Sequence, residues 1–357
     1  MVNRAKSATA TVGILIALFA VSPATGGEDE YYKIQSYDMG DLVLETSGIA
    51  LLKSGEVMIC TRRGEVFIVE NAYDPPKATF KRWAFGLSHP LGLLEHKGWI
   101  YTVQRGELTR MKDTTGDGKA DLFETVSDWI PISGNYHEYN FGPRLDHDGK
   151  LWVTTNKPFG GQPYGKAKFR GWALRFDPET GKMETMACGL RSPTGIKISP
   201  WGEAFYTDNQ GEWCNASKLS HIAKGDFHGH PHGIGSAKEP ESTVPHPGKV
   251  PNGVMMKDLK KQIPTFKMPA VWFPYGRMGK SPSGIAWDTS KGKFGPFAGQ
   301  LFVGDQNFAS LMRVYLEKID GHWQGACFDF RSGFMCGVIR VTQGKDGSMF
   351  VGMANAG

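Results

Sequence analysis

The sequence has no CxxC and no CxxCH motif among its five cysteines, Cys60, Cys188, Cys214, Cys327 and Cys336. A covalently attached haem and a zinc site of paired cysteines are therefore excluded from this stretch of chain. Because an exported chain can form disulfides, Cys188 and Cys214, which flank a predicted hairpin, are candidates for a bond. Cys60 lies in an apolar strand and is expected to be an inert core residue.

The sequence also lacks a strong charge imbalance and any long helical period. Its 41 Lys and Arg residues against 36 Asp and Glu give a net charge of +5, and the basic residues form no stripe. Nucleic acid is therefore not an expected partner. In contrast, 46 Gly and 21 Pro residues are spread along the chain, which is typical of many short strands joined by turns. The fold class is predicted to be all-β.

Long hydrophobic runs are absent apart from Val12–Val21, which is too short to span a bilayer as a stable helix. Arg4 and Lys6 precede this run, and Ser22-Pro23-Ala24 follows it with the small residues of a cleavage site. Residues 1–24 are therefore predicted to be a signal peptide cleaved after Ala24, the alternative being an uncleaved anchor. The mature protein is expected to be periplasmic or extracellular.

A short phrase repeats along the chain: a turn, a glycine with an apolar neighbour, a second glycine-bearing turn and a hydrophobic strand. The glycines that mark its six copies are Gly48, Gly92, Gly142, Gly195, Gly284 and Gly337. Their spacings are 44, 50, 53, 89 and 53 residues, and four of these match a four-stranded propeller blade of about 40–50 residues. We therefore predict a six-bladed β-propeller of four-stranded blades.

The repeats also predict how the chain is divided. Residues 25–44 form a lead-in and residues 45–357 the propeller, with an insert at 232–279 that is predicted to be a loop excursion on one face. The sixth copy stops after two strands, so the last blade is predicted to be incomplete. An open blade exposes an unpaired strand edge, so we expect the sequence to be a fragment. The alternative is that residues 31–44 supply the missing strands.

The sharpest local motif is an acidic, glycine-bearing loop with Gly118 at its turn. Oxygen ligands fall at the positions of an EF-type calcium loop in this order: Asp113, Thr115, Asp117, the carbonyl of Lys119, Asp121 and Glu124. The flanks are predicted strands, so the motif predicts a structural calcium loop on a propeller. The alternative is an acidic surface turn that binds nothing.

His137 precedes a predicted inner strand, where it can point into the axial mouth of a propeller. A neutral imidazole there can act as a general base, and Glu138 can orient it. The alternative is a structural histidine held by backbone groups. A cluster of histidines at residues 221–232 is consistent either with a transition-metal site or with a tight loop.

A third group of polar residues lies at the two ends of one predicted inner hairpin. Arg191 and Ser192 precede its first strand, and Gln210, Glu212 and Asn215 follow its second strand. An arginine can hold a carboxylate through two hydrogen bonds, so this rim is predicted to be a binding site. The alternative is ordinary loop chemistry with a surface arginine.

With these repeats and motifs, the chain resembles the soluble quinoprotein glucose/sorbosone dehydrogenase family over roughly residues 45–357. More closely, it is similar to exported bacterial propeller domains of this type, which are often joined to a c-type haem domain. The resemblance implies a six-bladed propeller with pyrroloquinoline quinone (PQQ) and Ca²⁺ over the axial mouth. It also implies a histidine that takes the proton as hydride leaves the sugar.

Two stretches carry most of the resemblance. His137, followed by Gly142, is similar to the family's base, with a slight offset. The run Arg191-Ser192-Pro193-Thr194-Gly195 resembles the family's Arg-Asn-Pro-x-Gly, with Ser192 in place of the asparagine. The resemblance therefore implies that Arg191 and Ser192 lie against the quinone and that Arg191 holds one of its carboxylates.

The hairpin that follows adds to the resemblance. Gln210-Gly211 is similar to the family's Gln-Gly pair, which implies that both residues lie at the cofactor. The carbonyls of Gly211 and Glu212 then correspond to calcium ligands, and Asn215 stands near the family's following aspartate.

The later blades depart from the family pattern. Gln306-Asn307-Phe308 stands where the family carries a lysine, and Phe334-Met335-Cys336 where it carries an Arg-x-Arg pair. Those basic groups balance a tricarboxylate cofactor, whose burial without them is costly. Candidate substitutes are Arg277, Lys280, Arg313, Arg331 and Arg340.

The sequence supports two functions. The first is a PQQ-dependent oxidoreductase acting on a sugar or polyol, with His137 as base and a cytochrome c or a fused haem domain as electron acceptor. The second is a non-catalytic propeller that binds a glycan or a protein at its rim. A calcium-assisted hydrolase or lactonase is less well supported, because it needs several inward carboxylates around the axis.

Overall fold

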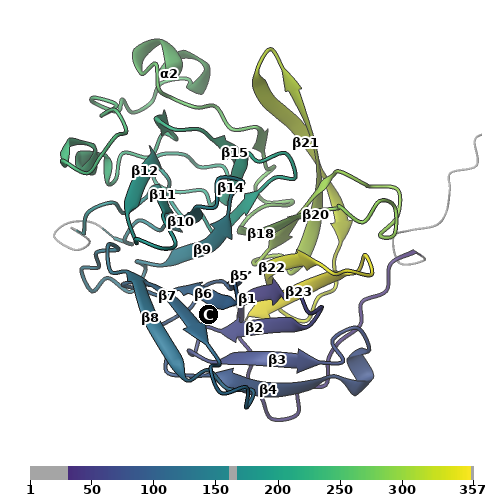
Figure 1. The fold of residues 1–357 in the computed structure, drawn as a ribbon. Coiled ribbons are helices and arrows are strands. Elements are labelled where there is room, and N and C mark those ends of the chain that lie inside the picture. Colours follow the sequence, from purple (N-terminus) through teal and green to yellow (C-terminus); the bar gives the residue numbers. More distant parts are fainter. Residues whose placement is uncertain (1–30, 161–166, 355–357) are drawn as a thin grey trace, which may run out of the picture. The chain divides into compact units, whose positions relative to one another are not determined.

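The computed structural model describes residues 31–160 and 167–354. All the described strands belong to one compact unit, which begins at Gln35. These strands form six separate sheets, which Figure 1 shows arranged around a central axis. No helix among the described residues is long and apolar enough to cross a membrane. The predicted signal peptide at residues 1–24 lies outside the described residues.

The first two sheets are four-stranded antiparallel meanders. Their strands are β1 (Thr46–Leu51), β2 (Val57–Thr61), β3 (Val66–Glu70) and β4 (Thr79–Ala84), then β5 (Leu94–His96), β6 (Trp99–Val103), β7 (Leu108–Lys112) and β8 (Leu122–Ser127). A 3₁₀ turn, η1 (Pro75–Lys77), links β3 to β4. The second strand of the first sheet is buried at every position, as expected for a β-branched and apolar strand covered by a neighbouring blade on each face.

The third and fourth sheets hold most of the candidate site. Their strands are β9 (Asn140–Leu145), β10 (Leu151–Thr155), β11 (Trp172–Phe176), β12 (Met183–Cys188) and β16 (Asp226–Phe227), then β13 (Gly195–Ile198), β14 (Ala204–Asp208), β15 (Lys218–Ile222) and β17 (Val271–Trp272). β16 joins the third sheet as a parallel edge strand beside β12.

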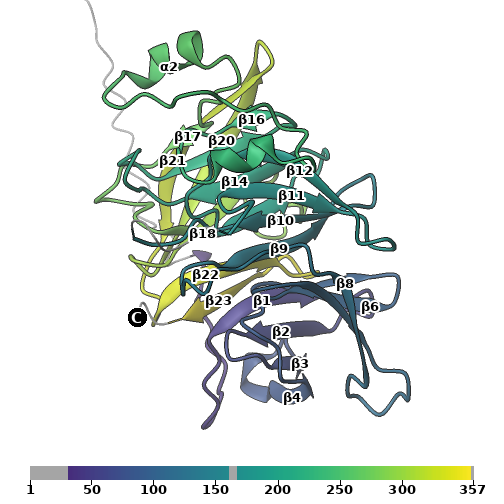
Figure 2. The same ribbon diagram turned by 90° about the vertical axis from the view of Figure 1, so that its left-hand side faces the viewer.

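The stretch 232–279, predicted to be a loop excursion, has structure of its own. It contains the 3₁₀ helix η2 (Ile234–Lys238) and the helix α2 (Met256–Gln262), which Figures 1 and 2 show at the periphery of the ring. Its last part is β17, which pairs with β15 and completes the fourth blade. The insert therefore lies between the third and fourth strands of one blade.

The last two sheets differ in size. They consist of β18 (Pro282–Trp287), β19 (Leu301–Asp305), β20 (Ser310–Ile319) and β21 (His322–Arg331), then β22 (Gly337–Gln343) and β23 (Met349–Ala354). The prediction of six blades is therefore corrected: the structure has five blades of four or five strands and a two-stranded sheet. The sixth repeat supplies two strands, and residues 35–45 supply none. β22 contacts both β18 and β1, so the small sheet closes the ring.

The repeated glycines mark the places where innermost strands of neighbouring blades meet. A Cβ on Gly48 would lie 2.6 Å from the Cα of Gly92, and one on Gly92 would lie 2.1 Å from the carbonyl oxygen of Gly142. A Cβ on Gly195 would lie 1.9 Å from the carbonyl oxygen of Ser283. Only glycine allows these backbones to approach so closely, which explains why the repeat carries it.

The five cysteines are free, so Cys188 and Cys214, the candidates for a disulfide, are not bonded to each other. Cys188 is fully buried in the core that joins the second and third blades. Cys60 is also fully buried, which confirms its prediction as a core residue.

Candidate functional site

Antiparallel pairing brings the loops that carry the predicted site residues to one edge of two neighbouring blades. In the third blade, Asn140 at the start of β9 pairs with Thr155 at the end of β10. In the fourth blade, Gly195 at the start of β13 pairs with Thr207 near the end of β14. We call the polar residues gathered there the polar mouth: His137, Asn156, Lys157, Arg191, Glu212 and His230.

His137 is held by Asn156 at the polar mouth. The Nδ2 group of Asn156 lies 2.7 Å from His137 Nδ1 and donates to the His137 carbonyl at 2.8 Å, while its Oδ1 is buried without a partner. A flipped amide would place Oδ1 against that carbonyl, so the amide orientation is set by the backbone. Asn156 therefore donates to Nδ1, and the neutral imidazole carries its proton on Nε2.

The predicted orienting residue, Glu138, does not contact the imidazole. Its side chain is buried, and its carboxylate accepts hydrogen bonds from the backbone N–H of Ser133, at 2.6 Å, and from the Ser133 hydroxyl. The sequence order placed Glu138 beside His137, but the two side chains leave the loop in different directions. Burial lowers the pKa of His137, and the charges of Arg191 and Lys157 lower it further, so the ring is neutral at pH 7.

Arg191 offers a free donor at the polar mouth. Its side chain is 13% exposed, and its Nε lies 3.9 Å from Glu212 with no hydrogen-bond partner. A Cβ on Gly211 would lie 2.8 Å from that nitrogen, so the glycine makes room for the guanidinium. A buried donor without a partner is costly unless a ligand satisfies it.

The backbone beside Arg191 is anchored by a buried ion pair. The carboxylate of Asp208 accepts the N–H groups of Arg191 at 3.1 Å and Ser192 at 2.6 Å. The same carboxylate pairs with Lys218 Nζ at 3.0 Å, and both side chains are almost completely buried. Asp208 and Lys218 therefore hold the loop that presents Arg191.

Glu212 joins the two halves of the mouth. Its carboxylate lies 2.9 Å from Lys157 Nζ and 3.2 Å from His230 Nε2. Burial by itself would raise the pKa of Glu212, but the hydrogen bonds from Lys157 and His230 outweigh burial and lower it to about 2. His230 Nδ1 accepts the N–H of His232, so its Nε2 carries the proton donated to Glu212.

The remaining residues predicted for the cofactor lie around this cluster. Ser192 is buried and Gln210 is half-buried, with its backbone N–H donated to Ser217. Asn215 is exposed on the turn that follows. The structure therefore brings His137 together with Arg191 and Glu212. Asn156 and Lys157 had not been predicted, although they directly follow a buried strand. His230 had been noted only as a member of the histidine cluster at residues 221–232.

The predicted calcium loop has a different arrangement from the one its spacing suggested. Asp113 accepts the N–H groups of Gly116 and Gly118, and Asp121 accepts that of Thr114 at 2.8 Å. Glu124, the predicted last ligand, lies on β8 and pairs with Arg110 at 2.7 Å. No group of three or more His, Cys, Asp or Glu side chains is gathered as a metal site in residues 31–160 and 167–354.

The substitute cations proposed for blades five and six lie in different places. Arg340 is bound by backbone carbonyls on the propeller axis, and the Arg313 guanidinium stacks on the rings of Phe297 and Phe328. Lys280 lies near the loop after β14, because Ser217 donates to its carbonyl, and its ammonium lies over Phe308. Of these three, Lys280 is the one beside the elements of the polar mouth.

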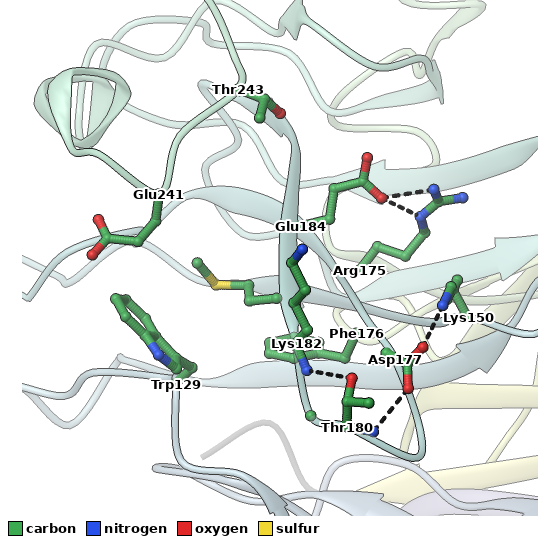
Figure 3. A pocket seen from close by; sticks show the side chains of 12 residues that line it. Trp129, Lys150, Arg175, Phe176, Asp177, Thr180, Lys182, Glu184, Glu241 and Thr243 are labelled. Carbon is green, nitrogen blue, oxygen red and sulfur yellow. Dashed lines mark hydrogen bonds and ion pairs between the residues drawn. The ribbon is translucent and has the colours of Figure 1, made fainter.

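A separate cavity lies at the opposite edge of the third blade, where the β11–β12 hairpin turns (Figure 3). Its volume is about 740 Å³, and Trp129 and Glu241 stand at one side of it. Four of its charged side chains form two ion pairs: Arg175 pairs with Glu184 at 2.6 Å, and Lys150 pairs with Asp177. We call this the outer cavity.

The ring of antiparallel sheets and the loop-borne polar mouth define the class of this protein as a β-propeller with a polar site at one edge of two blades. A model of a domain of unknown function, DUF7133, matches residues 63–262. The chain belongs to the DUF7133 family. A search of curated protein sequences finds no match.

Solved structures share the fold at low sequence identity. An oxidoreductase (glucose dehydrogenase) of Thermus thermophilus is 20% identical with a TM-score of 0.64, over 86% of this chain and 90% of that one. The PQQ-bound aldose sugar dehydrogenase of Streptomyces coelicolor is 15% identical with a TM-score of 0.63, over 91% and 94%. A calcium structure of a Trichoderma reesei carbohydrate-active enzyme of family AA12 is 14% identical with a TM-score of 0.63, over 89% and 92%. The predicted resemblance is confirmed for the fold.

Proposed function

We propose that this protein is a periplasmic, PQQ-dependent oxidoreductase acting on a sugar or polyol. The observation that carries the proposal is the gathering of His137, Arg191 and Glu212 at the polar mouth, from two blades of a propeller. The solved structures that share this fold include a PQQ-bound aldose sugar dehydrogenase and a calcium structure of a carbohydrate-active enzyme of family AA12. The expected export signal and a cytochrome c or fused haem domain as electron acceptor belong to the same proposal.

The polar mouth fits one carboxylate of the quinone. Arg191 has a buried Nε without a hydrogen-bond partner, in a cradle that a Cβ on Gly211 would fill. Arg191 and Gln210 would hold the cofactor, with calcium bound by the backbone carbonyls of Gly211 and Glu212. PQQ, when bound, supplies an acceptor for the hydride of a sugar carbon.

His137 would take the hydroxyl proton of the sugar at Nε2. This role requires the tautomer other than the one that the Asn156 contact favours: the imidazole proton must move to Nδ1, where the carbonyl of Lys157 lies 3.4 Å away as its acceptor. The lowered pKa of His137 keeps the ring neutral at pH 7, as a base must be. Lys157 and Glu212 hold the neighbouring charges in place through their 2.9 Å contact.

A second function, a non-catalytic module that binds a glycan, is favoured by one specific observation. Asn156 donates to His137 Nδ1 at 2.7 Å, which is a better hydrogen bond than the 3.4 Å contact to Lys157. In that state Nε2 is a donor and offers no lone pair. Such a mouth can bind sugar hydroxyls, but it cannot deprotonate them.

A titration of the full chain with PQQ and Ca²⁺, followed by absorbance, tests the proposal. We expect saturable binding that Arg191→Ala abolishes and that Arg82→Ala retains, since Arg82 lies exposed on the outermost strand of the first blade. A sugar and polyol panel with a dye acceptor then measures turnover. The absence of saturable binding in the wild-type chain would contradict the quinone, and a glycan-binding screen would then test the second function.

A further inference from the structure

Two exposed aromatic side chains flank His137 at the polar mouth. Tyr136 is 62% exposed and Phe159 is 49% exposed. The centroid of the His137 ring lies 5.8 Å from that of Tyr136 and 5.6 Å from that of Phe159, and the two outer rings are 6.3 Å apart. The three rings therefore form a compact triangle beside the polar groups. We call Tyr136 and Phe159 the aromatic collar.

One side chain, Asn135, joins the two loops that carry the collar. Its Oδ1 accepts the backbone N–H groups of His137 at 3.0 Å and Phe159 at 3.2 Å, and its Nδ2 donates to the Phe159 carbonyl at 2.9 Å. Arg105 binds the first loop from the second blade, where it donates to the carbonyls of Asn135 at 2.6 Å and Tyr136 at 3.3 Å. The backbone at both rings is therefore held by hydrogen bonds, so a ligand finds the collar largely preorganised.

Packing within the protein does not account for the collar. Neither Tyr136 nor Phe159 belongs to a hydrophobic core cluster among the residues that the structure describes. The two rings instead leave apolar surface exposed next to His137. Exposed apolar surface bordered by convergent polar groups is typical of a ligand site.

The polar mouth and the collar together offer two kinds of contact to one ligand. Arg191 and His137 provide hydrogen-bonding groups, and the collar provides flat apolar faces. A pyranose ring has the matching pattern, because its axial C–H groups form an apolar face and its hydroxyls surround the edge. An open-chain polyol carries similar hydroxyls on a flexible chain, so it has no fixed apolar face and loses more conformational entropy on binding.

We propose that the aromatic collar holds the apolar face of a pyranose ring and thereby selects cyclic sugars over open-chain polyols at the polar mouth. Tyr136 and Phe159 are then specificity-determining residues that bind the substrate beside His137. This inference rests on the proposed function, since it names which of the two substrate classes the site takes. The binding step needs no quinone, so it can be measured separately from the reaction.

Isothermal titration and saturation-transfer NMR of the full chain without quinone test the binding step. The probes are methyl glycosides locked as pyranose rings (gluco, galacto, manno and xylo) and the open-chain polyols sorbitol, mannitol and xylitol. We expect at least one pyranoside to bind more tightly than every polyol. Tyr136→Ala and Phe159→Ala should each weaken its binding by about fivefold, and should change the affinity for polyols by less than about twofold.

Two further variants separate stacking from other effects. Phe123→Ala is the matched control, because Phe123 is 45% exposed on β8, the outermost strand of the second blade, and its loss should leave pyranoside affinity unchanged. Tyr136→Phe keeps the ring and removes the hydroxyl, so it should bind pyranosides within about twofold of wild type. Because both collar side chains are exposed, every variant should keep its thermal midpoint within about 2 °C of wild type.

The reaction gives a second readout if the chain turns over sugars with quinone. The collar variants should then raise KM for the sugar and leave kcat within about twofold of wild type, because stacking acts on substrate and transition state alike. The proposal is overturned if pyranoside affinity survives the loss of both rings, or if no pyranoside binds the wild-type chain with or without quinone. A loss of PQQ affinity with unchanged pyranoside affinity would also overturn it, since the rings would then stack on the quinone. Failure of PQQ to bind contradicts only the proposed function, because the quinone-free titration still measures the collar.

Discussion

The polar mouth and the outer cavity lie at opposite edges of the third blade and use similar residue types in opposite ways. In the outer cavity, Arg175 and Lys150 are matched by Glu184 and Asp177. At the polar mouth, Arg191 keeps a buried donor without a partner. The Arg191 donor is therefore available to a ligand, whereas these two cations of the outer cavity are already paired.

The largest difference between the two regions is expected in the free energy of unfolding, when one lysine is replaced in or beside each of them. Lys218→Met leaves the buried Asp208 carboxylate without its cation and should lower the free energy of unfolding by about 3–5 kcal/mol. Lys150→Met breaks a partly exposed pair in the outer cavity and should cost about 1 kcal/mol or less. Urea unfolding of both variants measures the difference, and equal losses would contradict the comparison.

The second prediction changes the partner of His137. Asn156→Ala removes the N–H group that faces Nδ1 and leaves the carbonyl of Lys157 as the neighbour of that nitrogen, so it should move the imidazole proton to Nδ1 and free Nε2 as a base. If the protein is a dehydrogenase, turnover should rise by about 100-fold. Imidazole ¹⁵N NMR across a pH titration locates the proton in both chains, with Asn156→Gln as a control that keeps an amide. A wild-type chain already protonated at Nδ1 would contradict the assigned tautomer.

The third prediction concerns acid. Burial lowers the pKa of His230 to about 4 against an unfolded value near 6.5, so the unfolded chain binds a proton first as pH falls. The stability contribution of the neutral ring is therefore complete above pH 6.5 and is lost between pH 6.5 and 4, by up to about 3 kcal/mol. Glutamine does not titrate, so the difference in unfolding free energy between the wild-type chain and His230→Gln should shrink as the pH falls from 6.5 to 4. Unfolding free energies at several pH values measure it. A difference in unfolding free energy that does not change with pH would mean that the histidine is not held neutral.

The smallest effect on quinone binding is expected from a substitution in the outer cavity. Trp129→Ala should leave the PQQ titration within about twofold of wild type, because the residue shares no partner with the polar mouth. Arg191→Ala in the same assay is the matched comparison. A large loss of quinone affinity from the Trp129 change would place the ligand in the outer cavity instead.

Much of the fold could be predicted from local patterns. The glycine-marked repeat predicted the propeller because each copy is one supersecondary unit. The close approach of backbones at Gly48, Gly92 and Gly195 explains why each copy carries a glycine at this position. The number of complete blades was predicted less well. β17 completes the fourth blade from far along the chain, whereas the sixth repeat remains a two-stranded sheet.

The candidate site was predictable in its members but not in their contacts. His137 and Arg191 were chosen because they precede inner strands, and antiparallel pairing does bring their loops together. The partner of His137 is Asn156, nineteen positions later, and the neighbouring Glu138 binds Ser133 instead. The spacing of the acidic loop likewise matched a calcium motif, although β8 directs Glu124 toward Arg110.

By itself, the sequence determined the class of fold, the order of the blades and some of the polar side chains at one edge, because these follow from period and spacing along the backbone. Tertiary structure alone decided which side chains meet. It turned Asn156 toward His137, left Arg191 with a free donor, and directed Arg340 onto backbone carbonyls of three other blades. The physical reason is that a hydrogen bond or a charge interaction depends on direction and distance in space, which no spacing along the chain specifies.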